Sequence, residues 1–221
     1  MRSEARQQGS SADASSAPGL TPEATIGPFY PGAFVEDFPQ DLSVVGRLMA
    51  HRPQGQPISL SGRFFDALGK PVPSVIIEVW QANAQGRYRH PRDLSGLPLD
   101  PQFEGFARLR TGDDGAFSLV TIKPGAHPVR AGSHVMRAPH LRLTIFASGI
   151  DRLVTQVFFE GEPENGGDPV LKSISDSAVR KRLIAQRNRH LDAKGIAGYE
   201  LDFVLRGERE TLFFDDVHEF S

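Results

Sequence analysis

Short apolar stretches separated by turns that contain Gly, Pro or Asp run through most of this chain, and they constrain its fold more than any other feature. A turn such as Gly112-Asp-Asp-Gly115 ends one stretch before the next begins. We therefore predict strands at Ile58–Phe65, Ser74–Gln81, Phe106–Thr111, Ala116–Ile122, His140–Ala147, Leu153–Glu160, Tyr199–Leu205 and Glu210–Phe214. Such spacing predicts an all-β fold with an antiparallel β-sandwich core and long loops.

One segment, Ser175–Leu191, has the pattern of a helix, with Ser175 or Asp176 as its N-cap and Val179, Leu183 and Ile184 as its apolar stripe. We therefore expect a single short helix beside the strands.

A chain of 221 residues fits one all-β domain. Residues 1–20 are rich in Ser, Ala, Gln and Gly and predict a disordered tail, because such a segment cannot bury enough apolar surface to offset its ordering entropy. Prolines 22, 28 and 31 exclude a long helix after it. We expect residues 21–57 to form an arm and linker, packed on this domain or on a partner, and residues 58–221 to form the β-sandwich domain.

The charge balance gives no sign of a nucleic-acid or membrane partner, since Lys and Arg total 25 and Asp and Glu total 27. The chain has no cysteine, and no apolar run approaches the ~20 residues that cross a bilayer. We therefore expect a cytoplasmic protein that binds neither nucleic acid nor membranes.

Three of the seven histidines, His127, His134 and His140, lie between Thr121 and Phe146, with arginines among them. On the strand predicted from His140, alternation places His140 and Arg142 on the same face. A second histidine at that place would suit a metal, but a guanidinium has no lone pair to give. The pattern resembles a metal site that has lost a ligand. Ordinary solvated loop and strand residues are the alternative.

Six blocks of the sequence resemble the intradiol ring-cleavage dioxygenases, and among them the protocatechuate 3,4-dioxygenases. The likeness extends from about Thr21 to Asp216 and is carried by Gly62-Arg-Phe-Phe-Asp, Pro71-Val-Pro-Ser, Glu78-Val-Trp-Gln-Ala-Asn-Ala-Gln-Gly-Arg-Tyr-Arg-His, Leu99-Asp-Pro-Gln-Phe, Thr121-Ile-Lys-Pro-Gly-Ala and Ala138-Pro-His. The resemblance implies oxygen-dependent cleavage of a small catechol substrate.

That family binds one non-haem ferric ion through two tyrosines and two histidines. The resemblance places Ser95 and His127 at the tyrosine positions, and His140 and Arg142 at the histidine positions. Ser95 and a neutral imidazole supply no anionic oxygen to a ferric ion, and Arg142 adds a positive charge. The resemblance therefore implies no catalytic and no metal-binding residue in this chain, and it places Fe(III) in a homologous, iron-binding β-type partner subunit.

The resemblance to α-type subunits further implies that the Thr25-Ile-Gly-Pro-Phe29 segment reaches the partner's substrate pocket. Ser148 falls where α-type chains carry an arginine facing the substrate carboxylate, whereas Arg137 and Gln156 resemble residues of the catalytic β type. The expected substrate-binding residues are Thr25, Gly27, Pro28, Phe29, Tyr30 and Ser148.

These points predict the α-type subunit of a heteromeric protocatechuate 3,4-dioxygenase, which converts a catecholic acid to a carboxymuconate, with an isolated chain that is inactive. Two alternatives remain open at this point. One is a homomeric intradiol-like metalloenzyme with a site rebuilt around His127 and His140. The other is a non-catalytic β-sandwich binding or scaffold module.

Overall fold

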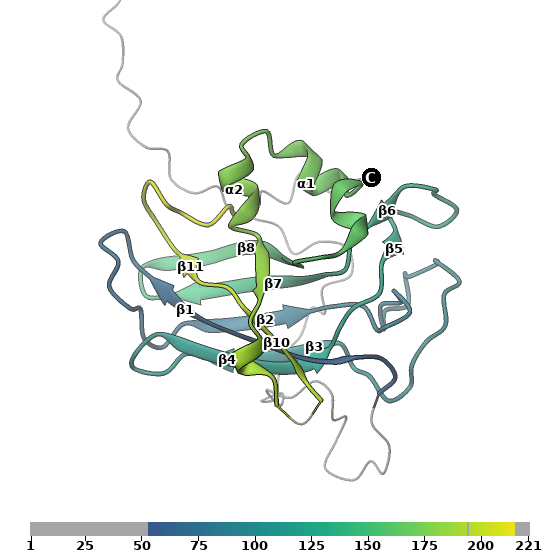
Figure 1. Cartoon of the computed structure of the whole chain (residues 1–221), viewed down its shortest axis with the longest axis horizontal. Helices are drawn as coiled ribbons and strands as arrows, with labels where there is room; N and C mark the ends of the chain where they lie inside the picture. Colours follow the sequence, from purple (N-terminus) through teal and green to yellow (C-terminus); the bar gives the residue numbers. More distant parts are fainter. Residues whose placement is uncertain (1–52, 194, 215–221) are drawn as a thin grey trace, which may run out of the picture.

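The computed structural model describes residues 53–193 and 195–214 (Figure 1). The predicted tail and nearly all of the predicted arm lie outside these residues. The strands are β1 (Pro57–Phe65), β2 (Ile76–Trp80), β3 (Phe106–Arg110), β4 (Ala116–Ile122), β5 (His127–Pro128), β6 (Met136–Arg137), β7 (His140–Ala147), β8 (Ile150–Phe159), β9 (Ile184–Arg187), β10 (Ala197–Glu200) and β11 (Phe203–Val204). The helices are α1 (Pro169–Ser173), α2 (Ser177–Lys181) and the 3-10 turns η1 (Pro163–Gly166) and η2 (Arg189–Leu191).

All strands except β5 and β6 belong to two layers that are joined by continuous pairing. One layer contains β4, β1, β10 and β11, and the other contains β3, β2, β7 and β8, while β9 pairs with both β10 and β8 and so joins the layers. A small ribbon of β5 and β6 stands apart at one end (Figure 1). The all-β sandwich predicted from the sequence is confirmed.

Three of the pairings run parallel, which the antiparallel prediction did not include. They join β1 to β10, β1 to β11, and β8 to β9. Parallel neighbours need a long connection between them. Here, the segment with η1, α1 and α2 separates β8 from β9 and supplies that length.

The core lies between the two layers. Along β1 the buried side chains alternate with less buried ones, so that Ile58, Leu60 and Phe64 face inwards. They belong to the same apolar cluster as Leu143 and Ile145 of β7. Burial of this set between two sheets is the main stabilising contribution to a sandwich of this size.

The helix predicted at Ser175–Leu191 is wrong over most of its length. Asp176 is its N-cap as expected, and accepts hydrogen bonds from Ala178 N at 2.7 Å and Val179 N at 3.4 Å. The helix nevertheless ends at Lys181, and the chain continues as β9. Both edges of β9 are paired, so sheet hydrogen bonds override the helical pattern there.

The last predicted strand, Glu210–Phe214, is also wrong, because it forms no regular strand. Two of its backbone amides still form hydrogen bonds: Thr211 N donates to Val204 O, and Phe214 N donates to Val154 O, both at 2.9 Å. The predicted strand Tyr199–Leu205 is divided into β10 and β11. The strands β4 and β7 have the bounds that the sequence predicts.

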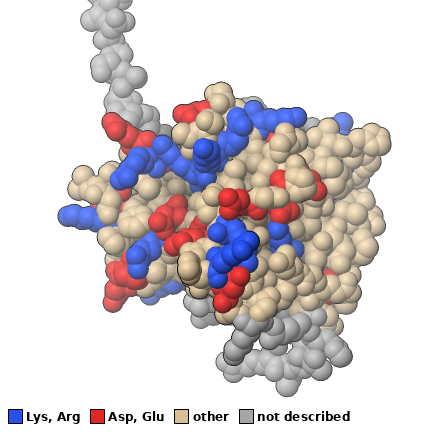
Figure 2. All heavy atoms as spheres, in the orientation of Figure 1, with Lys and Arg blue, Asp and Glu red and all other residues tan. Residues whose placement is uncertain are grey.

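On the face shown in Figure 2, acidic and basic side chains are interspersed rather than gathered in a stripe of one sign. This distribution agrees with the near-balanced composition. Within the described residues, no helix has the length and apolar character that a membrane span requires.

Candidate functional site

The resemblance blocks at Glu78–His90 and Thr121–Ala126 include the ends of β2 and β4 and the two neighbouring loops that follow these strands. Gln81 joins them, because its side-chain oxygen accepts a hydrogen bond from Thr121 Oγ1 at 2.7 Å and its amide nitrogen donates to Ile122 O at 2.9 Å. Gln81 and Thr121 are both buried. Their side chains thereby fix the distance between the two loops.

Asn83 shapes the first of these loops. Its side-chain oxygen accepts hydrogen bonds from Gln85 N and Arg87 N, at 3.0 and 2.9 Å. Gly86 follows with φ +84°, and a Cβ there would lie 2.3 Å from Ala126 O. Only glycine lets this loop approach the segment that leads to His127 so closely.

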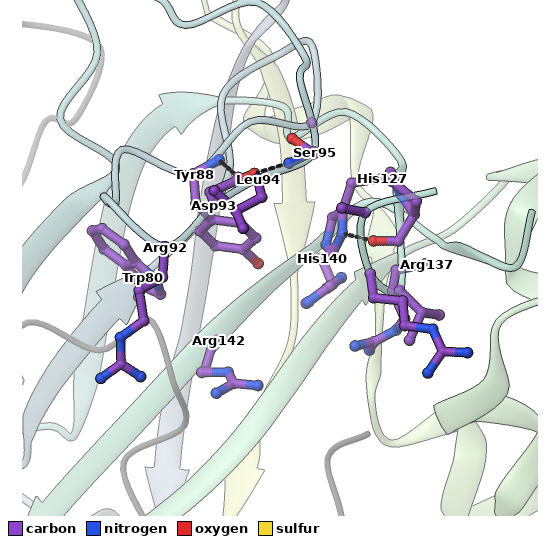
Figure 3. Close-up of a pocket in the computed structure, with 15 residues that line it drawn as sticks. Trp80, Tyr88, Arg92, Asp93, Leu94, Ser95, His127, Arg137, His140 and Arg142 are labelled. Carbon is purple, nitrogen blue, oxygen red and sulfur yellow. Dashed lines mark hydrogen bonds between the residues drawn. The ribbon is translucent and has the colours of Figure 1, made fainter. Parts of the chain in front are cut away.

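A cavity of about 390 Å³ opens beside these loops (Figure 3). Figure 3 shows Trp80 and Tyr88 on one side, His127, His140 and Arg137 on the other, and Arg142 between them. Ser95, His127, His140 and Arg142 all line the cavity. The four positions that resemble the family's ligands, which lie far apart in the sequence, therefore meet in one place.

The two imidazoles lie close together, with ring centroids 5.4 Å apart. His127 Nδ1 donates to Pro128 O at 3.0 Å, and His140 Nδ1 donates to Ala138 O at 2.8 Å, which leaves each Nε2 as the nitrogen with a lone pair when the ring is neutral. Burial lowers the pKa of His127, and it holds the pKa of His140 well below the ordinary value with help from the positive charge of Arg137. Both rings are therefore neutral at pH 7.

The aromatic side of the cavity is made by Trp80 and Tyr88, whose ring centroids are 5.8 Å apart. Trp80 is 5% exposed and also lines the cavity. Burial raises the pKa of Tyr88, against the opposing effect of Arg142 and Arg137. Tyr88 is therefore a neutral phenol at pH 7.

Arg137 closes the opposite side through a buried polar network. Its Nε donates to Asp168 Oδ2 at 3.0 Å and its Nη2 donates to Gln156 Oε1. Asp168 also accepts from Ala138 N, Val170 N and Leu171 N, and thereby caps α1. The positive charge of Arg137 is thus balanced within the wall.

These side chains do not fit a ferric ion. The four ligand positions, Ser95, His127, His140 and Arg142, offer two neutral imidazoles and one hydroxyl, but no anionic oxygen to offset the charge of the metal, and the last of them brings a cation into the same space. Within the described part of the chain, no group of three His, Cys, Asp or Glu side chains could hold a metal ion.

Of the expected substrate-binding residues, Ser148 is the one that the structure describes, and it does not line this cavity. Ser148 is exposed in the turn between β7 and β8, at the opposite end of β7 from His140. Thr25, Gly27, Pro28, Phe29 and Tyr30 lie outside the described residues.

Sequence reasoning missed Tyr88 and Asp168 as parts of the site. Tyr88 was assigned only to its motif block, although a tyrosine within that block is an evident aromatic neighbour for Trp80. Asp168 precedes a proline in the Gly167-Asp-Pro-Val170 stretch, which is a signal for a helix N-cap. No sequence signal pairs it with Arg137.

Comparison with known proteins agrees with this fold. A protein-family profile described as Dioxygenase matches residues 29–207. The protocatechuate 3,4-dioxygenase beta chain of Burkholderia cepacia is 42% identical over 161 residues, which cover 72% of this chain and 68% of that protein. The alpha chain of Pseudomonas putida is 35% identical over 202 residues, which cover 88% of this chain and 96% of that protein.

Among solved structures, a dioxygenase domain from Streptomyces sp. SirexAA-E matches with a TM-score of 0.60 and 27% identity, covering 86% of this chain and 99% of that domain. The 3-chlorocatechol 1,2-dioxygenase of Rhodococcus opacus 1CP has the same fold, with a TM-score of 0.62 at 21% identity, covering 83% of this chain and 72% of that one. The chain belongs to the intradiol dioxygenase family. Members of this family generally use non-haem ferric iron.

Proposed function

We propose that this chain is the iron-free, α-type subunit of a heteromeric protocatechuate 3,4-dioxygenase. In this proposal a homologous β-type subunit holds the ferric ion and cleaves a catecholic acid, and the present chain completes the partner's active site. The observation that carries the proposal is the content of the cavity: the four positions that resemble the iron ligands converge there, but they hold Ser95, His127, His140 and Arg142.

The relatives support the choice of an α-type chain. Identity is higher with the Burkholderia beta chain, but that match spans 161 residues, whereas the match with the Pseudomonas alpha chain spans 202 and covers 96% of it. We give the alpha chain more weight, because a subunit role is a property of the whole chain. A non-catalytic subunit also needs only the fold, and not the iron ligands that this chain lacks.

Iron content tests this proposal directly. The full chain is to be purified alone and together with a co-expressed homologue that has the complete Tyr, Tyr, His, His set. We expect the two proteins to co-purify, with iron and protocatechuate turnover in the complex and neither in the isolated chain. Stoichiometric iron with turnover in the isolated chain would end the proposal.

The role of the arm is a second part of the proposal. A Gly-Pro pair exposes backbone polar groups without bulk, and Thr25 offers a hydroxyl to a carboxylate. Deletion of residues 1–20 should leave the kinetics of the complex nearly unchanged, while deletion of residues 1–30 should raise KM or abolish turnover without removing iron from the partner. If both deletions behave alike, Thr25–Tyr30 does not line a substrate pocket.

A homomeric metalloenzyme is the second candidate, and one observation favours it: His127 Nε2 is buried and has no hydrogen-bond partner among residues 53–193 and 195–214. A metal bound through His127 and His140 would require a third donor. Titration of the isolated chain with Zn²⁺ and Fe²⁺, with His127→Gln beside it, separates the candidates. Tight binding of one metal ion that is lost in the variant would favour the metalloenzyme.

A further inference from the structure

The layer formed by β3, β2, β7 and β8 has an outer face, which is the side turned away from the core. Each strand places residues there that alternate with core residues, as Thr144 does between Leu143 and Ile145 of the core cluster. One row crosses all four strands on this face, and cross-strand pairing gives its order as Arg108, Glu78, Thr144 and Val154.

This row is buried although it faces away from the core. Glu78 and Thr144 are each 3% exposed, and Val154 is 5% exposed. Val154 belongs to none of the three apolar clusters of the described residues, unlike every other buried Val, Leu, Ile, Phe, Tyr, Trp and Ala side chain among them. The outer face of an antiparallel sheet is commonly solvated, so this one has the burial of a covered face.

Two described segments cover only the β8 side of this face. The helices α1 and α2 pack at one end of it, where Phe158 joins their apolar cluster. Residues 211–214 lie along the edge of β8, where Phe214 N donates to Val154 O at 2.9 Å. β7 lies between β8 and β2. These two contacts therefore leave the cover over Glu78 and Thr144 to another segment.

The N-terminal segment enters the domain beside this face. Gln54 N donates to Oδ2 of the buried Asp100 at 2.8 Å, and Gln85 Nε2 donates to Gln54 Oε1 at 3.0 Å. Asp100 and Gln85 both belong to the connection between β2 and β3, so residues before 53 start from the end of these two strands. An extended segment such as residues 33–49 spans up to roughly 55 Å, whereas the distance from β3 to β8 is only about 15 Å.

Residues 33–49 also have the composition of a cover. Their large apolar side chains are Phe34, Val35, Phe38, Leu42, Val44, Val45, Leu48 and Met49. Pro39 excludes a continuous helix. The acidic residues 36, 37 and 41 complement the guanidinium groups that Arg108 and Arg110 place on β3. Residues 215–221, by contrast, carry only two large apolar side chains, Val217 and Phe220.

We infer that residues 33–49 of the same chain dock on the outer face and cover the row from Arg108 to Val154. The inference goes beyond the proposed function and does not depend on it, because it involves neither iron nor a partner subunit. It divides the arm into two parts: residues 33–49 belong to the chain's own sandwich, and Thr25–Tyr30 is the part left to reach a partner.

A photo-crosslink in the full-length chain tests this docking. The chain has no cysteine, so Ile76→Cys, at a 39% exposed position on the outer face, takes a single benzophenone maleimide. We expect irradiation to give adducts within residues 33–49, located by mass spectrometry after digestion. Ser118→Cys is the matched control, because Ser118 is exposed on β4 in the other layer and should not give these adducts.

A mixture of isotope-labelled and unlabelled chains shows which chain supplies the docked segment. We expect adducts in which both peptides carry the same isotope, since the segment belongs to the same chain. Adducts of mixed isotope would assign the cover to a second copy, and adducts within residues 215–221 would assign it to the C-terminal segment. Either result, or no adduct within residues 33–49, overturns the inference and leaves the proposed function standing.

A second measurement follows the cover without the bulky label. Thr144→Cys, at a buried position of the row, should react slowly with a small maleimide in the full-length chain. Phe34→Ser combined with Phe38→Ser should raise that rate by about 10-fold or more, because the docked segment then opens locally. The same pair should leave the circular dichroism spectrum and the reaction rate of Ser118→Cys unchanged. An unchanged rate at Thr144→Cys would show that residues 33–49 do not cover this face.

Discussion

Two aspartates form ion pairs of similar chemistry in opposite environments. Asp168 pairs with Arg137 in the cavity wall, where the two side chains are 0% and 6% exposed. Asp192 pairs with Arg187, the last residue of β9, where they are 41% and 29% exposed. The first pair is called the wall pair below, and the second is called the edge pair. Each aspartate also accepts backbone N–H groups, so the pairs differ mainly in their access to water.

This difference shows which charges the site depends on. A solvent-exposed pair contributes little to stability, because water and salt screen it. A buried pair contributes little when it is intact, but removal of one partner leaves an uncompensated charge in the interior. The wall pair joins β6 to the N-cap of α1. Loss of one of its partners should therefore lower the unfolding free energy much more than loss of a partner in the edge pair.

The largest expected effect is that of Asp168→Ala. The change leaves Arg137 buried without its anion, which costs about 3–5 kcal/mol of unfolding free energy. It also removes the cap of α1, at Val170 N and Leu171 N, which costs about 0.5–2 kcal/mol more. Urea denaturation followed by circular dichroism measures the loss.

Asp176→Ala is the matched control for Asp168→Ala. Asp176 caps α2 through Ala178 N and Val179 N but is exposed and has no buried arginine beside it. We expect a loss of about 1 kcal/mol. Equal losses in the two variants would show that the buried charge contributes nothing beyond the cap, and the contrast between wall and edge would fail.

The second effect concerns the uncharged side of the same cavity. Trp80→Ala removes a buried ring that packs against Tyr88 and Phe106, and it should cost about 3–5 kcal/mol of unfolding free energy. Leu94→Ala, at a cavity position that is 76% exposed, should change stability by less than about 0.5 kcal/mol. A stable Trp80→Ala protein whose complex has lost activity would assign Trp80 to the substrate instead of the core.

Strands such as β1 could be predicted from sequence because burial in a two-layer sandwich imposes a local alternation. The meeting of Ser95, His127, His140 and Arg142 was anticipated only through the family resemblance, since no local pattern joins residues so far apart. β9 escaped prediction for a related reason: its strand state depends on β8 and β10, which the local helical pattern of Leu183 and Ile184 does not reveal.

The polar network of the wall was beyond sequence reasoning altogether. The resemblance singles out Arg137 and Gln156, but the hydrogen bonds that join Arg137 to both Gln156 and Asp168 depend on how the N-cap of α1 lies beside β6 in the folded chain. Pairing of buried charges is decided by tertiary geometry, and a sequence shows only that the charges exist.

The third prediction concerns the pH dependence of stability that the two cavity histidines cause. His127 and His140 have pKa values below the unfolded value of about 6.5, so the unfolded chain binds protons that the folded chain refuses. Stability should be constant above about pH 7.5 and fall as the pH decreases below 6.5, by at most about 1.4 kcal/mol per pH unit for each histidine. Urea denaturation between pH 8 and pH 5 measures this slope.

His140→Gln should make that slope smaller, because one of the two groups is removed. His134→Gln, at an exposed position in the turn between β5 and β6, is the substitution control. A slope that His140→Gln leaves unchanged would place the titrating group elsewhere in the molecule.

The smallest effect is expected at the edge pair. The Arg187 guanidinium and Gly198 N hold the pKa of Asp192 at about 2, below its ordinary 3.8. The stability from this pair is therefore fully present above about pH 4 and is lost as the pH falls towards 2, a window well below that of the two histidines. Arg187→Gln should raise the pKa of Asp192, measured from its carboxyl chemical shift, and Arg187→Lys should raise it less because the charge remains.

Added salt should make the lowering of the Asp192 pKa smaller and leave the loss of unfolding free energy in Asp168→Ala nearly unchanged, since only the exposed pair is screened. Equal sensitivity to salt at both aspartates would mean that water reaches the wall pair, and the distinction between the two regions would then be one of geometry and not of burial.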